Sequence, residues 1–204
     1  GSHSFLAYLG YLSGFAHISD CMQDRAFRHA ARTLMLDEQA PTLRIKDVDL
    51  TQYADKLIAR FANPALKHKT WQIAMDGSQK LPQRMLAGIR IHLARETDWS
   101  LLALGVAGWM RYVSGVDDAG NAIDVRDPLS DKIRELVAGS SSEQRVTALL
   151  SLREVFGDDL PDNPHFVQAI EQGAIKHPQN LTISAVKADE ARLRPLPPSL
   201  FCLF

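Results

Sequence analysis

Residues 97–115, TDWSLLALGVAGWMRYVSG, constrain the fold more than any other stretch of the sequence. Their apolar side chains would occupy most faces of a helix rather than one stripe, which is typical of a helix that other elements surround. Gly105 and Gly108 leave room on this helix for a neighbouring backbone. The rest of the chain is therefore expected to pack around one central, buried helix.

Two amphipathic helices are predicted before this segment. Residues 24–41 repeat apolar side chains at helical spacing and stop at Pro41, whose ring would clash with a continuing helix. Residues 49–64 show the same pattern, with Asp49 as the N-cap and Pro64 beyond the end. The predicted inward positions of the two helices are Phe27, Ala30, Ala31, Leu34, Met35, Leu50, Tyr53, Leu57, Ile58 and Phe61.

Helical periodicity continues after the central segment, with further helices predicted near residues 128–138, 142–156 and 163–173. No stretch alternates as a strand, so the predicted fold class is all-α, with one helical domain over residues 1–175. Residues 176–204 lose the periodicity and end in RLRPLPPSLFCLF. They are predicted to be an extended or disordered tail, with packing against the core as the alternative.

Composition excludes several function classes. The 204 residues are 46% hydrophobic and 23% charged, as in an ordinary globular protein, and a net charge of −1 would not gather nucleic acid or an anionic membrane. Cys21 and Cys202 are too far apart in sequence to suggest a disulfide framework or a zinc site. No apolar run is long enough to span a bilayer. We therefore expect a cytoplasmic protein with no nucleic-acid or membrane partner.

Three short patterns have a structural and a functional interpretation, and the structural one is favoured for each. Gly10 and Gly14 have the spacing of close helix packing rather than of a ligand contact. His17 and Cys21 could begin a metal site, but two ligands are too few, so a packed or surface pair is favoured. Residues 115–124, GVDDAGNAID, lack the closing Glu of a calcium loop and indicate a polar turn. No metal site is predicted.

Residues 70–84, TWQIAMDGSQKLPQR, resist a purely structural interpretation. Asp76-Gly77 interrupts the helical pattern, Ser78 could cap the next helix, and Lys80 would then lie in its first turn. A cation is disfavoured there by the helix dipole, and Arg84 adds a second cation one turn later. The pattern indicates either an anion-binding corner or two solvated side chains.

Five stretches of the chain resemble one family of enzymes. They are GSHSFLAYLGYLSG, NPALKHKTWQIAMDGSQKLPQR, LALGVAGWMRY, GVDDAGNAIDVRDP and FGDDLPDNPHF. Together they resemble the C-terminal domain of the mannitol dehydrogenase family of polyol dehydrogenases, within it most of all the bacterial D-mannonate oxidoreductases, or fructuronate reductases. The resemblance runs from Gly1 to about Ala174.

The resemblance implies a catalytic role for His3. A Lys-x4-Asn-x2-His motif crosses into the helical domain of this family, and GSHSFLAYLGYL begins one residue after its Asn. His3 then matches the motif histidine, which would stabilise charge on the reacting oxygen. The motif Lys, the implied acid/base, and the Rossmann domain that would bind NAD lie upstream, so the fragment alone is expected to be inactive. The alternative is that Gly1-Ser2-His3 is the remnant of a cleaved expression tag.

The resemblance also implies a substrate site. Lys80 matches a substrate-binding lysine of the family, whereas Gln72 replaces an arginine of the mannitol-specific relatives. Loss of that arginine favours a carboxylated sugar, whose carboxylate Arg84, or His68 or Lys69, could meet. The implied reaction interconverts D-mannonate and D-fructuronate with NAD and no metal. The alternatives are an altronate (tagaturonate) or mannitol-type dehydrogenase domain, or a stand-alone helical interaction module. Expected partners are a sugar acid, the N-terminal Rossmann domain and, through weak self-association, a second copy.

Overall fold

The computed structural model describes residues 1–45, 47–117 and 119–175 of the chain. Lys46, Asp118 and the predicted tail, residues 176–204, lie outside the described residues. The described part consists of helices and short connections, with two isolated β-bridges and no strand. The predicted all-α fold is therefore confirmed.

The helices follow one another closely along the chain. The α-helices are α1 (Ser2–Leu12), α2 (Ile18–Gln23), α3 (Arg25–Thr33), α4 (Leu50–Phe61), α5 (Thr70–Ala74), α6 (Gly77–Leu81), α7 (Ala87–Arg95), α8 (Ser100–Val113), α9 (Ser130–Val137), α10 (Ser142–Leu150), α11 (Arg153–Phe156) and α12 (Pro164–Ile175). Two π-helical segments, η1 (Leu34–Gln39) and η4 (Pro82–Leu86), and two 3-10 segments, η2 (Ala40–Thr42) and η3 (Pro64–Leu66), complete the described elements.

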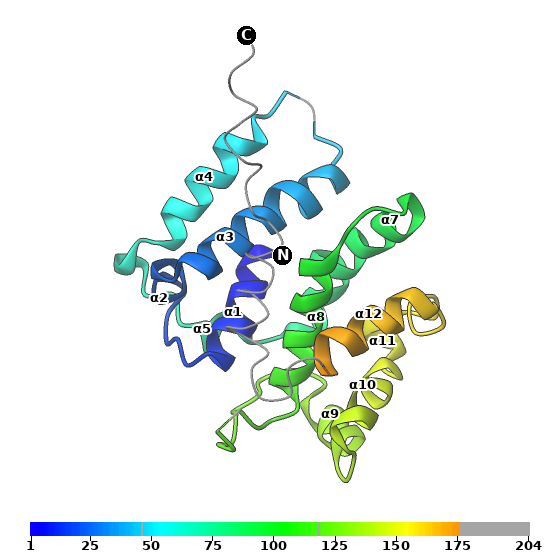
Figure 1. The fold of residues 1–204 in the computed structure, drawn as a ribbon. Coiled ribbons are helices and arrows are strands. Elements are labelled where there is room, and N and C mark those ends of the chain that lie inside the picture. The colour runs from blue at the N-terminus through cyan, green and yellow to red at the C-terminus, as the bar shows by residue number, and fades with distance from the viewer. Residues whose placement is uncertain (46, 118, 176–204) are drawn as a thin grey trace, which may run out of the picture.

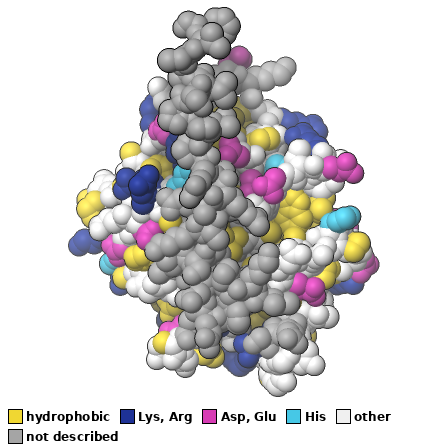
Figure 2. All heavy atoms as spheres, in the orientation of Figure 1, with side chains coloured by type: hydrophobic (Ala, Val, Ile, Leu, Met, Phe, Trp, Pro, Cys, Tyr) yellow, Lys and Arg dark blue, Asp and Glu magenta, His cyan; other side chains and the backbone are white. Residues whose placement is uncertain are grey.

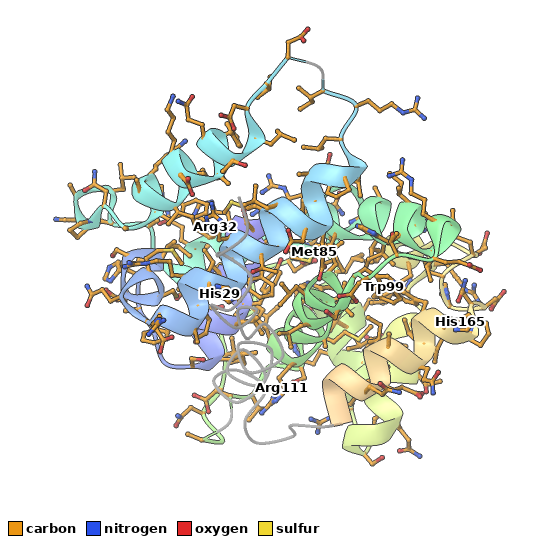
Figure 3. The ribbon with its side chains drawn as sticks, turned by 45° about the horizontal axis from the view of Figure 1, so that its top comes forward. His29, Arg32, Met85, Trp99, Arg111 and His165 are labelled. Carbon is orange, nitrogen blue, oxygen red and sulfur yellow. The ribbon has the colours of Figure 1, made fainter. Side chains whose placement is uncertain are left out.

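Helix α8 is the buried centre of the fold, as the sequence predicts. All of its residues except Ser100 and Arg111 are buried. A β-carbon on Gly108 would lie 2.7 Å from Leu9 Cδ2, so the glycine allows α1 to approach α8 closely. A β-carbon on Gly105 would lie 3.0 Å from Met85 Sδ, and Figure 3 labels Met85 in the interior of the molecule.

The other helices surround α1 and α8 in two groups. Helices α2, α3 and α4 lie on one side, whereas α9 to α12 lie on the other, and α7 lies above α12 in this view (Figure 1). The main contacts of α1 are with α5 and α8, and α12 packs on α8. Acidic and basic side chains are interspersed over the visible face outside the grey atoms (Figure 2).

Two details of the predicted helices are wrong, and a third helix ends as predicted but is divided. The helix predicted to stop at Pro41 consists of α3, η1 and η2 in succession and ends at Thr42, one residue later. Tyr53 is 59% exposed, because α4 buries only Ala54 and Phe61 fully against the core. The predicted helix over residues 142–156 is interrupted by a turn, and becomes α10 and α11.

Glu38 connects η1 to the central helix. Its carboxylate accepts hydrogen bonds from the backbone N–H groups of Leu101 (2.8 Å) and Leu102 (2.7 Å), and it is only 3% exposed. These N–H groups belong to the first turn of α8, which has no partner within the helix for them. Nε2 of buried His92 on α7 donates to the Glu38 carbonyl oxygen at 2.6 Å. Three helical segments therefore meet at one buried residue, Glu38.

The short patterns noted in the sequence have structural roles. Gly10 packs on buried Cys21, whose sulfur would lie 2.4 Å from a β-carbon there. Cys21 Sγ is 3.6 Å from the His17 carbonyl oxygen, and the His17 ring pairs with Asp20. Within the described residues, no three His, Cys, Asp or Glu side chains gather as metal ligands would. None of the described helices combines the length and apolar character that crossing a membrane requires.

Candidate active site

His3 lies in the first turn of α1, where two segments from elsewhere in the chain meet it. Its ring stacks on Phe61, the last residue of α4, with centroids 4.8 Å apart and an interplanar angle of 19°. The ring of His68, which precedes α5, has its centroid 5.4 Å from that of His3. Because Phe61 is buried, it holds one face of the His3 ring in a fixed place.

Burial and nearby basic groups both act on the His3 ring. Burial has the largest effect on the pKa of His3, and His68, Arg60 and Arg84 lower it further, to about 4. The ring is therefore neutral at neutral pH. Its Nε2 atom is buried and has no hydrogen-bond partner among the described residues. A neutral imidazole with a free nitrogen can form one hydrogen bond to a ligand oxygen.

The low pKa of His3 makes stability depend on pH. The unfolded chain binds a proton at His3 near the ordinary pKa of 6.5, whereas the folded chain does so only near 4. The free energy of unfolding should therefore fall as the pH is lowered through this window. We therefore expect the His3→Gln variant to lose less stability than wild type between about pH 7 and about pH 5. The measurement is the shift of the urea unfolding midpoint between these two pH values. An equal loss in wild type and His3→Gln would contradict the assignment.

Lys80 lies in α6, and the backbone before that helix holds its ammonium group. Lys80 Nζ donates to the carbonyl oxygens of Ile73 (3.2 Å) and Met75 (2.5 Å). Burial is the main cause that lowers the pKa of Lys80; Asp76 and Asp127 oppose the shift, and Arg84 adds to it. With two of three N–H groups directed at carbonyls, one remains for a ligand.

The start of α6 differs from the prediction. Asp76, in a left-handed conformation at φ 55°, occupies the N-cap position, so Ser78 is inside the helix and is not its cap. Asp127 Oδ2 instead accepts from the Ser78 backbone N–H at 2.8 Å. Helix α6 continues through η4 into α7 with right-handed helical backbone at each junction, so Lys80 lies near the start of this helical run, as predicted.

Residues 116–129 form the outer support of this corner. Trp71 Nε1 donates to the Asp124 carbonyl oxygen at 2.8 Å, and the Arg126 guanidinium lies 4.7 Å from the centre of the Trp71 ring. The Asp76 backbone N–H donates to the Arg126 carbonyl oxygen at 3.0 Å. Asp117, part of the stretch that faintly resembles a calcium loop, accepts from the Asn121 backbone N–H and side chain within its own turn. The predicted polar turn therefore anchors α5 through Asp124, and the residues after it, Arg126 and Asp127, anchor the start of α6.

Of the five predicted site residues, the structure brings the rings of His3 and His68 together. Arg84 in η4 lowers the pKa of both His3 and Lys80, and no contact joins Lys80 to His3 among the described residues. Gln72 is exposed on α5, and no hydrogen bond joins it to the other four in the described part of the chain. Lys69, the alternative carboxylate contact, is exposed at the N-cap of α5.

Two neighbours of His3 were missed by sequence reasoning. Phe61 was predicted only as a core residue, and Arg60 was not singled out at all. Both end a helix far from His3 in sequence, and only the packing of α4 brings them to α1. No spacing rule within a single helix could have found this contact.

A cavity of about 440 Å³ adjoins the cluster on the side of Arg84. Its walls come from the start of α1, the segment from η1 to η2, helix α4, and η4 with α7. Gly1 and Ser2 line it, whereas His3, His68 and Lys80 do not. The cavity is therefore a neighbour of the candidate site and not its centre.

Known proteins share this sequence and fold. The family model described as "Mannitol dehydrogenase C-terminal domain" matches residues 1–176, a range that includes His3. The chain is 98% identical over 172 residues to the oxidoreductase YeiQ of Escherichia coli (strain K12), covering 84% of this chain and 35% of that protein. It is 57% identical over 171 residues to the D-mannonate oxidoreductase of the same organism, covering 83% and 35%.

A solved structure agrees with these sequence matches. The mannitol 2-dehydrogenase of Pseudomonas fluorescens, in a ternary complex with NAD and D-mannitol, aligns with a TM-score of 0.85 and 30% identity. The alignment covers 96% of this chain and 39% of that one. The chain spans about a third of the length of the curated relatives above. Matched by the family model from its first residue, this chain belongs to the mannitol dehydrogenase family of oxidoreductases, as a C-terminal domain.

Proposed function

We propose that the chain is the substrate-binding half of an NAD-dependent oxidoreductase that interconverts D-mannonate and D-fructuronate. The observation that carries the proposal is the neutral His3 ring, whose buried Nε2 atom has no partner among the described residues and whose pKa Arg60 and Arg84 help to lower. Such surroundings suit a substrate that combines a reacting hydroxyl with a negative charge. The 57% identity to a D-mannonate oxidoreductase supports the same substrate.

In this proposal His3 acts on the reacting oxygen. Oxidation of a secondary alcohol develops negative charge on the oxygen as the proton leaves, and reduction passes through the same state. A neutral imidazole N–H directed at that oxygen stabilises the charge without transferring a proton. Phe61 keeps the ring in place, and Lys80 directs its remaining N–H at a substrate hydroxyl. The proton acceptor is assigned to the upstream Lys that the family motif implies.

NAD is proposed to bind mainly outside this chain. A dinucleotide site of the usual type needs a strand that leads through a glycine-rich turn into a helix. The described residues contain no strand, and so they do not form such a cradle. When bound, NAD supplies the hydride acceptor or donor. We assign its binding to the N-terminal domain of a longer protein, meaning one that contains these residues and has the length of the relatives.

The proposed contact with that domain lies on the side of His3 and Lys80. The start of α1 is at this surface, because Gly1 lines the cavity beside Arg84. Apolar side chains are exposed nearby on the segment before α4 and on α4 itself: Leu43, Ile45, Val48 and Tyr53. An exposed apolar group of this kind is typical of a surface that another domain covers. Without that domain, the same surface would favour weak association between copies.

A substrate panel tests the proposed reaction. In the longer protein, with NAD, we expect kcat/KM for D-mannonate to exceed that for D-mannitol by about tenfold or more, since a charge-assisted contact contributes about 1.5–3 kcal/mol. The same assay with D-altronate in place of D-mannonate tests the preference for the epimer. The assay with NADP in place of NAD tests the preference for the cofactor. A higher kcat/KM for D-mannitol than for both sugar acids would contradict the proposal.

A further inference from the structure

Two arginines near His3 have no carboxylate partner in the described part of the chain. They are Arg60, in the last turn of α4, and Arg84, in η4, and both are exposed. Five other arginines pair with aspartates, whereas Arg28 and Arg95 donate to backbone carbonyl oxygens and have no carboxylate partner in the described part of the chain. The pairs are Arg32–Asp55 (2.9 Å), Arg90–Asp159 (2.6 Å), Arg126–Asp124 (3.1 Å), Arg134–Asp131 (3.0 Å) and Arg153–Asp162 (3.3 Å). Arg60 and Arg84 both lower the pKa of His3, the histidine among the described residues whose buried Nε2 atom lacks a partner.

The packing fixes the backbones that carry both arginines. Arg60 directly precedes Phe61, the residue on which the His3 ring stacks. The Arg84 carbonyl oxygen lies 2.6 Å from where a β-carbon on Gly1 would be, so η4 adjoins the first turn of α1. The backbones of the two arginines therefore reach the surroundings of His3 from different helices. Two positive charges near one another are stabilised when an anion binds between them.

Lys80 is less suited to hold a carboxylate than these arginines. Its ammonium group already donates to the Ile73 and Met75 carbonyl oxygens, and Asp76 and Asp127 lie within electrostatic range of it. A guanidinium group, by contrast, presents a planar fork of donors that matches a carboxylate. Arg60 and Arg84 have free N–H donors and no carboxylate partner in the described part of the chain.

We propose that Arg60 and Arg84 together hold the carboxylate of a sugar acid whose reacting hydroxyl lies against His3. The inference rests on the proposed function, since it names the groups that would select a carboxylated substrate. The proposed arrangement makes Arg60 a specificity-determining residue. Lys80 would then donate a hydrogen bond to a hydroxyl group of the substrate. Removal of either arginine should therefore weaken the binding of carboxylated sugars and leave the binding of neutral sugars unchanged.

Binding by the chain itself provides the first test. The His3 ring is followed by NMR as sodium D-mannonate, D-mannitol or NAD is added, with His3→Gln identifying the signal. We expect D-mannonate to raise the pKa of His3 from about 4, because a bound anion offsets the surrounding cations, and D-mannitol to leave it unchanged. Arg60→Ala and Arg84→Ala should each weaken D-mannonate binding by about tenfold or more. Arg60→Lys should recover part of the loss.

Arg134→Ala is the matched control. This exposed arginine belongs to α9, which packs on α10 away from the site, and its loss should not change D-mannonate binding. The proposal is overturned if D-mannonate does not move the His3 signal, if Arg60→Ala binds it as wild type does, or if NAD shifts His3 more than D-mannonate. The last result would assign the cations to the diphosphate of the cofactor.

Kinetics of the longer protein separate this inference from the proposed reaction. Turnover of D-mannonate with an unchanged KM in both arginine variants would overturn the carboxylate assignment and leave the reaction standing. Binding of D-mannonate through both arginines without turnover would overturn the reaction and support the assignment. A rise in KM of about tenfold or more for D-mannonate alone, with KM for D-mannitol unchanged, would support both.

Discussion

Replacing His3 with alanine in the longer protein is expected to lower kcat/KM for its sugar substrate by about 10²–10³-fold. The Nε2 atom of His3 is buried and has no partner among the described residues, and the ring is kept neutral by its surroundings, which suits the proposed hydrogen bond to the reacting oxygen. That bond strengthens as charge develops on the oxygen. The loss should therefore appear mainly in kcat, with a smaller change in KM.

His3→Gln is the conservative partner of this variant. Its amide can still donate a hydrogen bond, so it should retain more activity than His3→Ala. The dissociation constant of NAD serves as the structural readout and should be unchanged in both variants. A kcat/KM for His3→Ala within about twofold of wild type would show that His3 has no part in the chemistry.

Replacing Glu38 with alanine is expected to lower the free energy of unfolding by about 3 kcal/mol. The carboxylate is buried, and its two oxygens accept from the first N–H groups of α8, the central helix. Its removal would leave these N–H groups without partners and open a space between η1 and α8. Urea unfolding followed by circular dichroism measures the change.

Two variants show whether burial of this cap matters. Glu38→Gln keeps one acceptor oxygen and the shape of the side chain, so its cost should be smaller. Asp49 caps α4 through the Gln52 backbone N–H at 2.9 Å but is exposed, and Asp49→Ala should cost only about 1 kcal/mol. An equal cost for Glu38→Ala and Asp49→Ala would contradict the role assigned to burial.

Local patterns were sufficient to predict most of the helices. The apolar run of α8 and the cap at Asp49 act within a few residues, so the sequence shows them directly. The errors arise where contacts between residues distant in sequence determine the helix geometry or the exposure of a side chain. The regular helix expected up to Pro41 becomes π-helical in η1, which places Glu38 under α8, and Tyr53 is exposed because α4 packs through a narrow face.

The candidate site was predictable only in part. The resemblance directed attention to His3 and Lys80, and the run of cations directed it to Arg84. Arg60 was missed because its relation to His3 depends on how α4 packs against α1, a contact between residues distant in sequence. The carbonyl partners of Lys80 were missed because they depend on the break in the chain at Asp76.

The division of the site between this chain and an N-terminal domain is tested most directly by comparing the chain with the longer protein. NAD is titrated into each by calorimetry, and each is assayed for NAD-dependent oxidation of D-mannonate. We expect the longer protein to bind NAD and oxidise D-mannonate, and the chain alone to do neither, because the described residues form no dinucleotide cradle. NAD-dependent turnover by the chain alone would contradict this account, because the chemistry would then have to come from residues assigned here to structure.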